Sequence, residues 1–117
     1  MAISRAFSFA KLIRNSKQIQ RFFEIADTAG TIDSFAAGSY PAAHYIVTAE
    51  NSNQIHTTEI LVQHNGTTVS MNEYGTLYSN GALATYDVTI TSGVVKLRGT
   101  PTNSNTDFKF KVQYVES

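Results

Sequence analysis

Three histidines are the side chains in this sequence best suited to bind a metal ion. His56 and His64 lie eight residues apart on one face of an expected strand, which separates them by roughly 26 Å at about 3.3 Å per residue. One zinc ion cannot bridge that distance. His44 lies on another expected strand, with no carboxylate placed to support it. The sequence has no cysteine, so it predicts no metal site.

Two carboxylates, Glu59 and Glu73, flank an Asn65-Gly66 turn and could suggest an acid–base pair. The expected register places Glu59 opposite Asn72 and Glu73 on the opposite face, so the two acids cannot flank one glycosidic bond. The chain contains no nucleophile-elbow, P-loop or dinucleotide-binding motif. We therefore expect a protein that is not an enzyme, with no catalytic residue and no cofactor.

The elements that position these residues are short strands. The chain has 117 residues, which is the size of one domain, and it contains no apolar run long enough to span a membrane. Residues 27–41 are small and carry glycine and proline, which predicts a linker and a short strand near 31–37. From Ala42 the apolar residues alternate, so Tyr45, Val47 and Ala49 share one face of a strand.

Two hairpins follow. A two-residue type I′ loop at Asn65-Gly66 is favoured because both positions accept a positive φ angle. That loop predicts the pairs His64 with Thr67, Val62 with Val69, and Ile60 with Met71. A second loop at Ser92-Gly93 predicts the pairs Ile90 with Val95, Val88 with Leu97, Tyr86 with Gly99, and an ion pair of Asp87 with Arg98.

The last expected strand, DFKFKVQYV, alternates apolar and polar residues. Six or seven such strands predict a mainly β fold, an antiparallel β-sandwich or jelly-roll-like domain. The expected core is Ile60, Val62, Val69, Met71, Val88, Ile90, Val95, Leu97, Phe108, Phe110 and Val112.

The first 23 residues differ from the rest. They hold five of the nine basic residues and none of the nine acidic ones. At 100° per residue, one face carries Phe9, Leu12, Ile19 and Phe23, with Ile13 beside them and Phe22 off the face, which predicts an amphipathic helical arm. We divide the chain into an arm and linker, residues 1–31, and a β-sandwich domain, residues 32–117. The proposed interface anchor comprises Phe9, Leu12, Arg14, Lys17, Ile19, Arg21 and Phe23.

The arm has three possible roles. It could dock on another chain, pack on its own sheet, or contact nucleic acid or a membrane. A repeated Lys/Arg cluster typical of nucleic-acid patches is missing, and the body is acidic. We therefore expect a protein partner and neither nucleic acid nor membrane.

Four stretches carry a resemblance to a known family: IDSFAAGSYPAAHYIV, TTEILVQHNGTT, NEYGTLYSNGALATYDVTI and VVKLRGTPTNS. In this order they resemble a small β-domain that recurs in virion proteins of marine tailed bacteriophages, especially cyanophages. The Glu-Tyr-Gly at 73–75 is among the most telling matches. Residues 1–31 lie outside the resemblance.

The resemblance implies a structural component of a tailed-phage virion, and it carries over no catalytic residue. We expect a small capsid decoration or cement protein or a tail-associated protein, held by its N-terminal arm. Its partners would be other virion proteins, including further copies of itself in a homo-oligomer. The alternative is a tail or fibre-associated module that recognises host surface glycan, for which Tyr74 and Tyr78 are the candidate aromatic contacts.

Overall fold

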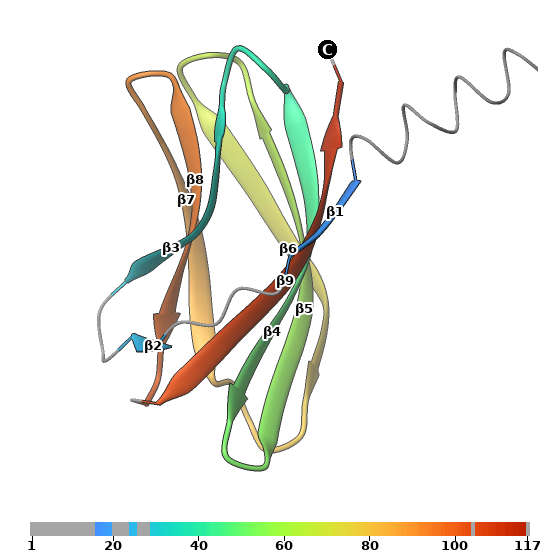
Figure 1. The fold of residues 1–117 in the computed structure, drawn as a ribbon, viewed down its shortest axis with the longest axis vertical. Coiled ribbons are helices and arrows are strands. Elements are labelled where there is room, and N and C mark those ends of the chain that lie inside the picture. The colour runs from blue at the N-terminus through green and yellow to red at the C-terminus, as the bar shows by residue number, and fades with distance from the viewer. Residues whose placement is uncertain (1–15, 20–23, 26–28, 104, 117) are drawn as a thin grey trace, which may run out of the picture.

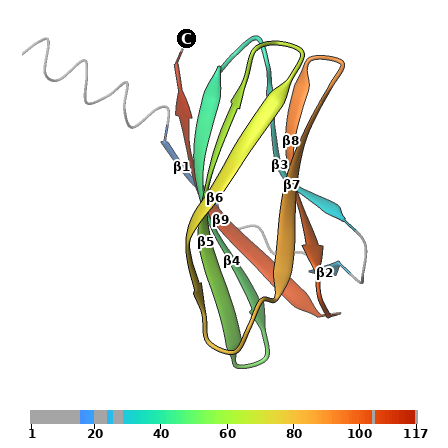
Figure 2. The ribbon, with the colours of Figure 1, turned by 180° about the vertical axis from the view of Figure 1, so that it is seen from behind.

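The computed structural model describes residues 16–19, 24–25, 29–103 and 105–116, with side chains from residue 29 onward (Figure 1). Over these residues all regular structure is β-strand, in two antiparallel sheets that face one another (Figures 1 and 2). The strands are β1 (Ser16–Ile19), β2 (Glu24–Ile25), β3 (Gly30–Ala36), β4 (Ala42–Asn51), β5 (Gln54–His64), β6 (Val69–Tyr78), β7 (Ala84–Thr91), β8 (Val94–Pro101) and β9 (Thr106–Val115).

The larger sheet has the order β1-β9-β4-β5-β6, with β2 also paired to β9, and the smaller sheet has the order β3-β8-β7. Because side chains alternate along a strand, every second side chain points into the space between the sheets and the others point outward. The prediction of an antiparallel β-sandwich is therefore confirmed at the level of two packed sheets.

The helix expected from Phe9 to Phe23 is wrong at Ser16–Ile19, which form strand β1 and pair with β9. The edge of β9 presents unpaired backbone N–H and C=O groups, and pairing satisfies them, whereas a helix would not. The remainder of the expected helix lies outside the described residues. The division of the chain at residue 31 stays a prediction, although β1 and β2 join the sheet of the following domain.

The hairpin at Ser92-Gly93 forms with the expected register, including Ile90 opposite Val95. Both loop residues have positive φ angles, 51° and 75°, as a type I′ turn requires. Asp87 and Arg98 form the expected cross-strand ion pair at 3.4 Å.

The other hairpin forms with a shifted register, because the loop residues are Gly66 and Thr67. Only Gly66 has a positive φ angle, 99°. The Asn65 side chain instead accepts hydrogen bonds from the backbone N–H groups of Thr67 and Thr68, at 3.1 and 2.8 Å. This side-chain turn fixes Asn65 without a left-handed backbone. Val62 consequently lies opposite Met71. The shift is two residues, so each side chain keeps its expected face.

Seven of the eleven expected core residues are buried. Val69, Met71, Val88 and Ile90 are only partly buried, because they lie on β6 and β7, which are edge strands of the two sheets. Tyr45 and Ile32 are fully buried and extend the core toward β4 and β3. The full set of buried apolar residues is Ile32, Phe35, Ala43, Tyr45, Val47, Ala49, Ile60, Val62, Leu83, Ala84, Val95, Leu97, Phe108, Phe110, Val112 and Tyr114.

Candidate functional site

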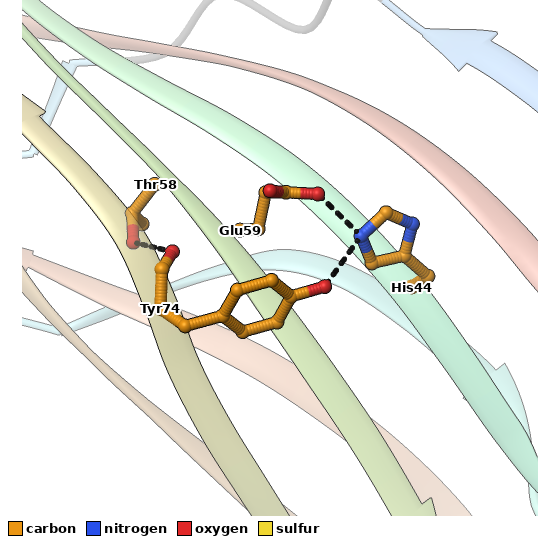
Figure 3. A network of polar contacts seen from close by, with 4 residues as sticks. All are labelled: His44, Thr58, Glu59 and Tyr74. Carbon is orange, nitrogen blue, oxygen red and sulfur yellow. Dashed lines mark hydrogen bonds and ion pairs between the residues drawn. The ribbon is translucent and has the colours of Figure 1, made fainter.

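Three polar side chains meet on the outer face of the larger sheet, each from a different strand (Figure 3). His44 of β4 lies between Glu59 of β5 and Tyr74 of β6. Its Nε2 atom is 2.9 Å from Glu59 Oε1 and 3.1 Å from the Tyr74 hydroxyl. An ionised carboxylate only accepts, so the Nε2 atom carries the proton that it donates to Glu59. The two rings are near-parallel, at 17°, with centroids 6.4 Å apart.

A β-bulge in β6 positions Tyr74 for this contact. Gly75, at a φ angle of 64°, is the extra residue where the register between β5 and β6 shifts. The Thr58 hydroxyl fastens the bulge: it donates to the Tyr74 carbonyl at 3.1 Å and lies 2.8 Å from the Thr76 hydroxyl. A Cβ atom on Gly75 would meet Glu59 Oε2 at 3.2 Å, so glycine also leaves room for the Glu59 side chain.

Exposed apolar side chains surround the three polar ones. In the register of the sheet, Leu61 lies opposite His44 and Ile46 lies opposite Glu59. Leu77 follows Tyr74 on the same outer face beyond the bulge. Leu61 and Leu77 are 46% and 71% exposed. We call this set the outer patch: His44, Ile46, Glu59, Leu61, Tyr74 and Leu77.

The strands that carry the outer patch contain acidic residues and no lysine or arginine. Residues 42–78, which span β4, β5 and β6, include Glu50, Glu59 and Glu73 but no lysine or arginine. The basic residues of the described strands are on β1, β8 and β9: Lys17, Lys96, Arg98, Lys109 and Lys111. Only Glu59 of these glutamates lies in the outer patch, because Glu73 is opposite the buried Ile60. Glu50 forms an ion pair with Lys109, at 3.0 Å, and Lys111 lies opposite Ile46 at the β9 side of the patch. The outer patch therefore combines apolar contact area with one carboxylate, which suits an apolar partner that carries a basic group.

Within the described ranges, no three histidine or acidic side chains gather closely enough to hold a metal ion. The same residues include no helix long and apolar enough to cross a membrane. The groups that the outer patch does offer are hydrogen-bonding and apolar contacts on an open sheet face, which is the composition of a binding surface.

Two further polar contacts are buried between the sheets. Asp33 of β3 accepts hydrogen bonds from the hydroxyls of Tyr45 and Tyr114, at 2.8 and 2.7 Å. Burial, together with the charge of Asp33 and its hydrogen bond, raises the pKa of Tyr45 far above its usual range, so this hydroxyl remains a donor. The contact joins the smaller sheet to two strands of the larger one and is structural.

The second buried contact is incomplete. His56 of β5 accepts a hydrogen bond at Nδ1 from the backbone N–H of Leu83, at 3.2 Å. Its Nε2 atom and the Tyr86 hydroxyl are both buried without a hydrogen-bond partner. Burial lowers the pKa of His56, an effect that Glu73 partly opposes. Burial also raises the pKa of Tyr86, with Glu73 adding to the shift.

The sequence-predicted anchor residues are not brought together by the described structure. Lys17 and Ile19 lie on β1, opposite Val112 and Phe110. The others, Phe9, Leu12, Arg14, Arg21 and Phe23, lie outside the described residues.

Tyr74 and Tyr78, the candidate aromatic contacts for a glycan, both lie within β6. Simple alternation places residues four apart on one face, but the bulge at Gly75 reverses the faces between them. The Tyr78 ring lies against His56, with ring centroids 4.7 Å apart. The two tyrosines therefore do not form a common aromatic platform.

The contact between His44 and Glu59 is absent from the sequence prediction, and the expectation that no carboxylate supports His44 is wrong. The signal that could have found it is the turn between β4 and β5. A two-residue loop at Ser52-Asn53 pairs Ile46 with Glu59, which places Glu59 diagonally beside His44.

The fold occurs as a segment of a larger protein. It superposes on the tailspike protein of Acinetobacter phage vB_ApiP_P1 with a TM-score of 0.51 and 18% sequence identity, over 87% of this chain and 21% of that one. A weaker superposition, with a TM-score of 0.42 and 10% identity, joins 92% of this chain to 27% of the tailspike protein of Acinetobacter baumannii phage AM24. No protein-family profile and no curated protein matches the sequence. The chain thus covers about a fifth of the first tailspike's length.

Proposed function

We propose that this chain is a structural, non-catalytic module of a tailed-phage virion, associated with the tail. The observation that carries the proposal is the fold, which is similar over 87% of the chain to a segment of a phage tailspike protein. The resemblance of the β-domain to virion proteins of marine tailed phages supports the same class. A role in the tail is preferred to capsid decoration because the structural neighbour is a tail protein.

The outer patch supports a role in assembly. Ile46, Leu61 and Leu77 are exposed beside a hydrogen-bonded His44–Glu59 pair, on the outer face of the larger sheet. Such a face gives a partner both apolar contact and a fixed hydrogen-bonding pattern. The partners in this proposal are other virion proteins, including further copies of the chain, and residues 1–23 serve as the anchor.

Glycan recognition is the second candidate. Tyr74 favours it, because this residue is 37% exposed and lies beside a carboxylate and an imidazole that could bind sugar hydroxyls. Tyr78 does not strengthen it, since this ring packs on His56.

Immunogold labelling of phage particles tests the virion role. Antibodies raised against residues 29–117 should label the tails of purified particles of the phage that encodes this chain. Label on the head would instead favour capsid decoration, and particles without label would overturn the virion proposal. A glycan array with the purified protein tests the second candidate: binding that Tyr74→Ala abolishes would support it, and an array without signal would reject it.

A further inference from the structure

We propose that the outer patch is the docking surface for residues 1–15 of a neighbouring copy of this chain. This inference rests on the proposed role of the N-terminal residues as an assembly anchor, and it names the surface that receives them. Three observations carry it: complementary charge, complementary apolar character, and the position at which the chain enters β1.

The charges of the two segments are opposite. Residues 1–15 include Arg5, Lys11 and Arg14 and no acidic residue. Residues 42–78 include three glutamates and no lysine or arginine. Glu59 lies within the outer patch and is 37% exposed, with its Oε1 atom 2.9 Å from His44 Nε2. A basic residue of the segment is therefore attracted to Glu59 within the patch, whereas Lys111, opposite Ile46, repels it at the β9 side.

The apolar content also matches. Residues 1–15 contain Phe7, Phe9, Leu12 and Ile13. The outer patch offers Ile46, Leu61, Tyr74 and Leu77, all among the exposed large apolar residues of the body. Fifteen residues reach about 50 Å when extended and about 22 Å as a helix. The three strands of the patch span only about 10 Å across, so the segment is long enough to cover the patch.

The chain direction favours a neighbouring copy over the chain's own patch. Ser16 is opposite Gln113 and Ile19 is opposite Phe110, so β1 enters the sheet at the end of β9 that is paired with the start of β4 (Figure 1). Ile46 and Glu59 lie level with Lys111, in the opposite direction along the sheet. Residues before Ser16 would have to reverse direction to cover their own patch.

This contact joins two different surfaces of identical chains, so copies would add head to tail. Such heterologous contacts build rings when the rotation closes and filaments when it does not. Glu59 and the basic residues would orient the segment, while the aromatic and aliphatic side chains would supply most of the affinity.

Two variants of the full chain separate the donor from the acceptor. Leu61→Lys with Leu77→Lys alters the outer patch at exposed positions, and Lys11→Glu with Arg14→Glu alters the N-terminal segment. Thr85→Lys with Thr91→Lys is the matched control, because it adds the same charge at exposed positions of the smaller sheet. Thermal melting confirms that each variant keeps the wild-type fold.

Sedimentation velocity then decides the proposal. The wild-type chain and the control should self-associate, whereas each altered variant alone should sediment as a monomer, with a Kd about a hundredfold weaker. Mixing the two altered variants should restore a 1:1 dimer, because one retains the segment and the other retains the patch.

Other outcomes overturn the inference. A wild-type chain that is monomeric would show that the patch binds a different molecule, such as a glycan or another virion protein. Self-association by either altered variant at wild-type strength would exclude the segment–patch contact. A mixture that stays monomeric would show that the segment of one copy does not bind the patch of another. Gold label on the tail together with a monomeric chain would reject this contact but leave the virion role supported.

Discussion

The two faces of the larger sheet use the same strands for different purposes. The inner face carries fully buried side chains such as Tyr45, Ile60 and Phe108, and its polar groups are hydrogen-bonded in most places. The outer face leaves Leu61 and Leu77 exposed around a hydrogen-bonded pair. A change on the inner face should therefore alter the free energy of unfolding, and a change on the outer face should alter association.

The largest effect is expected at Phe110. Replacing Phe110 by alanine should lower the free energy of unfolding by about 3–5 kcal/mol, because it leaves a cavity in the core. Urea denaturation measures it. Lys111→Ala, on the outer face of the same strand, is the control and should change stability by less than about 0.5 kcal/mol. Equal effects of the two changes would show that the faces are assigned the wrong way round.

The second-largest effect is expected for Asp33→Ala, which should lower the free energy of unfolding by about 2–4 kcal/mol. The change leaves the hydroxyls of Tyr45 and Tyr114 buried without their acceptor, and each unsatisfied hydroxyl costs about 1–3 kcal/mol. The free energy of unfolding from denaturant titration measures the loss. Asp87→Ala removes an exposed carboxylate and should have little effect. A melt of Asp33→Ala that matches wild type would exclude a structural role for this contact.

Gly99→Ala should cost about 1–3 kcal/mol by overpacking the inner face. A Cβ atom at this position would come within 2.9 Å of Ile32 Cδ1 and 3.1 Å of Phe108 Cε1. Gly38→Ala is the matched control, since a Cβ atom there would meet nothing within 4 Å beyond its chain neighbours. Melting temperatures compare the two variants. A control that is destabilised as much as Gly99→Ala would point to backbone effects rather than to packing.

Lowering the pH should reduce the free energy of unfolding through His56, which is buried on the inner face. Its pKa is lowered by burial, so the unfolded chain binds a proton more readily than the folded one. The stability that His56 contributes is therefore present near neutral pH and is lost as the pH falls below about 6.5, the usual histidine value. Glu73 opposes the shift, and the Tyr78 and Tyr86 rings lie against His56. Burial raises the pKa of Tyr86, so its hydroxyl carries no charge in this range.

Denaturation of wild type and His56→Asn at pH values of about 7.5 and about 5.5, on either side of the usual histidine pKa, isolates this contribution from the other titrating groups. Wild type should lose more stability between the two pH values than the variant does. Equal losses would show that the pKa of His56 is the same in the folded and the unfolded chain.

The smallest effect on stability is expected at Glu59. Glu59→Gln keeps an oxygen that can accept from His44 and removes a partly exposed charge, so the free energy of unfolding should change by less than about 0.5 kcal/mol. Self-association, measured by sedimentation, should weaken. A large stability loss would show that the outer cluster holds the sheet together and would remove the contrast between the two faces.

Alternation along single strands is sufficient to predict the inner face. Phe108, Phe110 and Val112 are buried as expected, because a period of two fixes the face without knowledge of the partner strand. The outer cluster requires the partners as well. His44 and Glu59 are fifteen residues apart, and only the pairing of β4 with β5 brings them together.

The bulge cannot be predicted from alternation at all. Gly75 adds one residue to β6 and reverses the faces after Tyr74, so residue spacing alone misplaces Tyr78. The β1 strand cannot be predicted from its own sequence for a similar reason. Its conformation depends on the open edge of β9, almost a hundred residues later in the chain, as the pairing of Ser16 with Gln113 shows.

The position of β9 also determines when the larger sheet can be completed during translation. β9 is made after every other described strand, yet it lies between β4 on one side and β1 and β2 on the other. While the ribosome is still translating β8, neither β1 nor β2 has a strand to pair with, and β4 lacks one of its two neighbours. A chain that terminates before Thr106 would thus lose the strand that joins β1 and β2 to β4, and Ser16–Ile19 would have no partner strand. The larger sheet can therefore be completed only late in translation, after β9 has been synthesised.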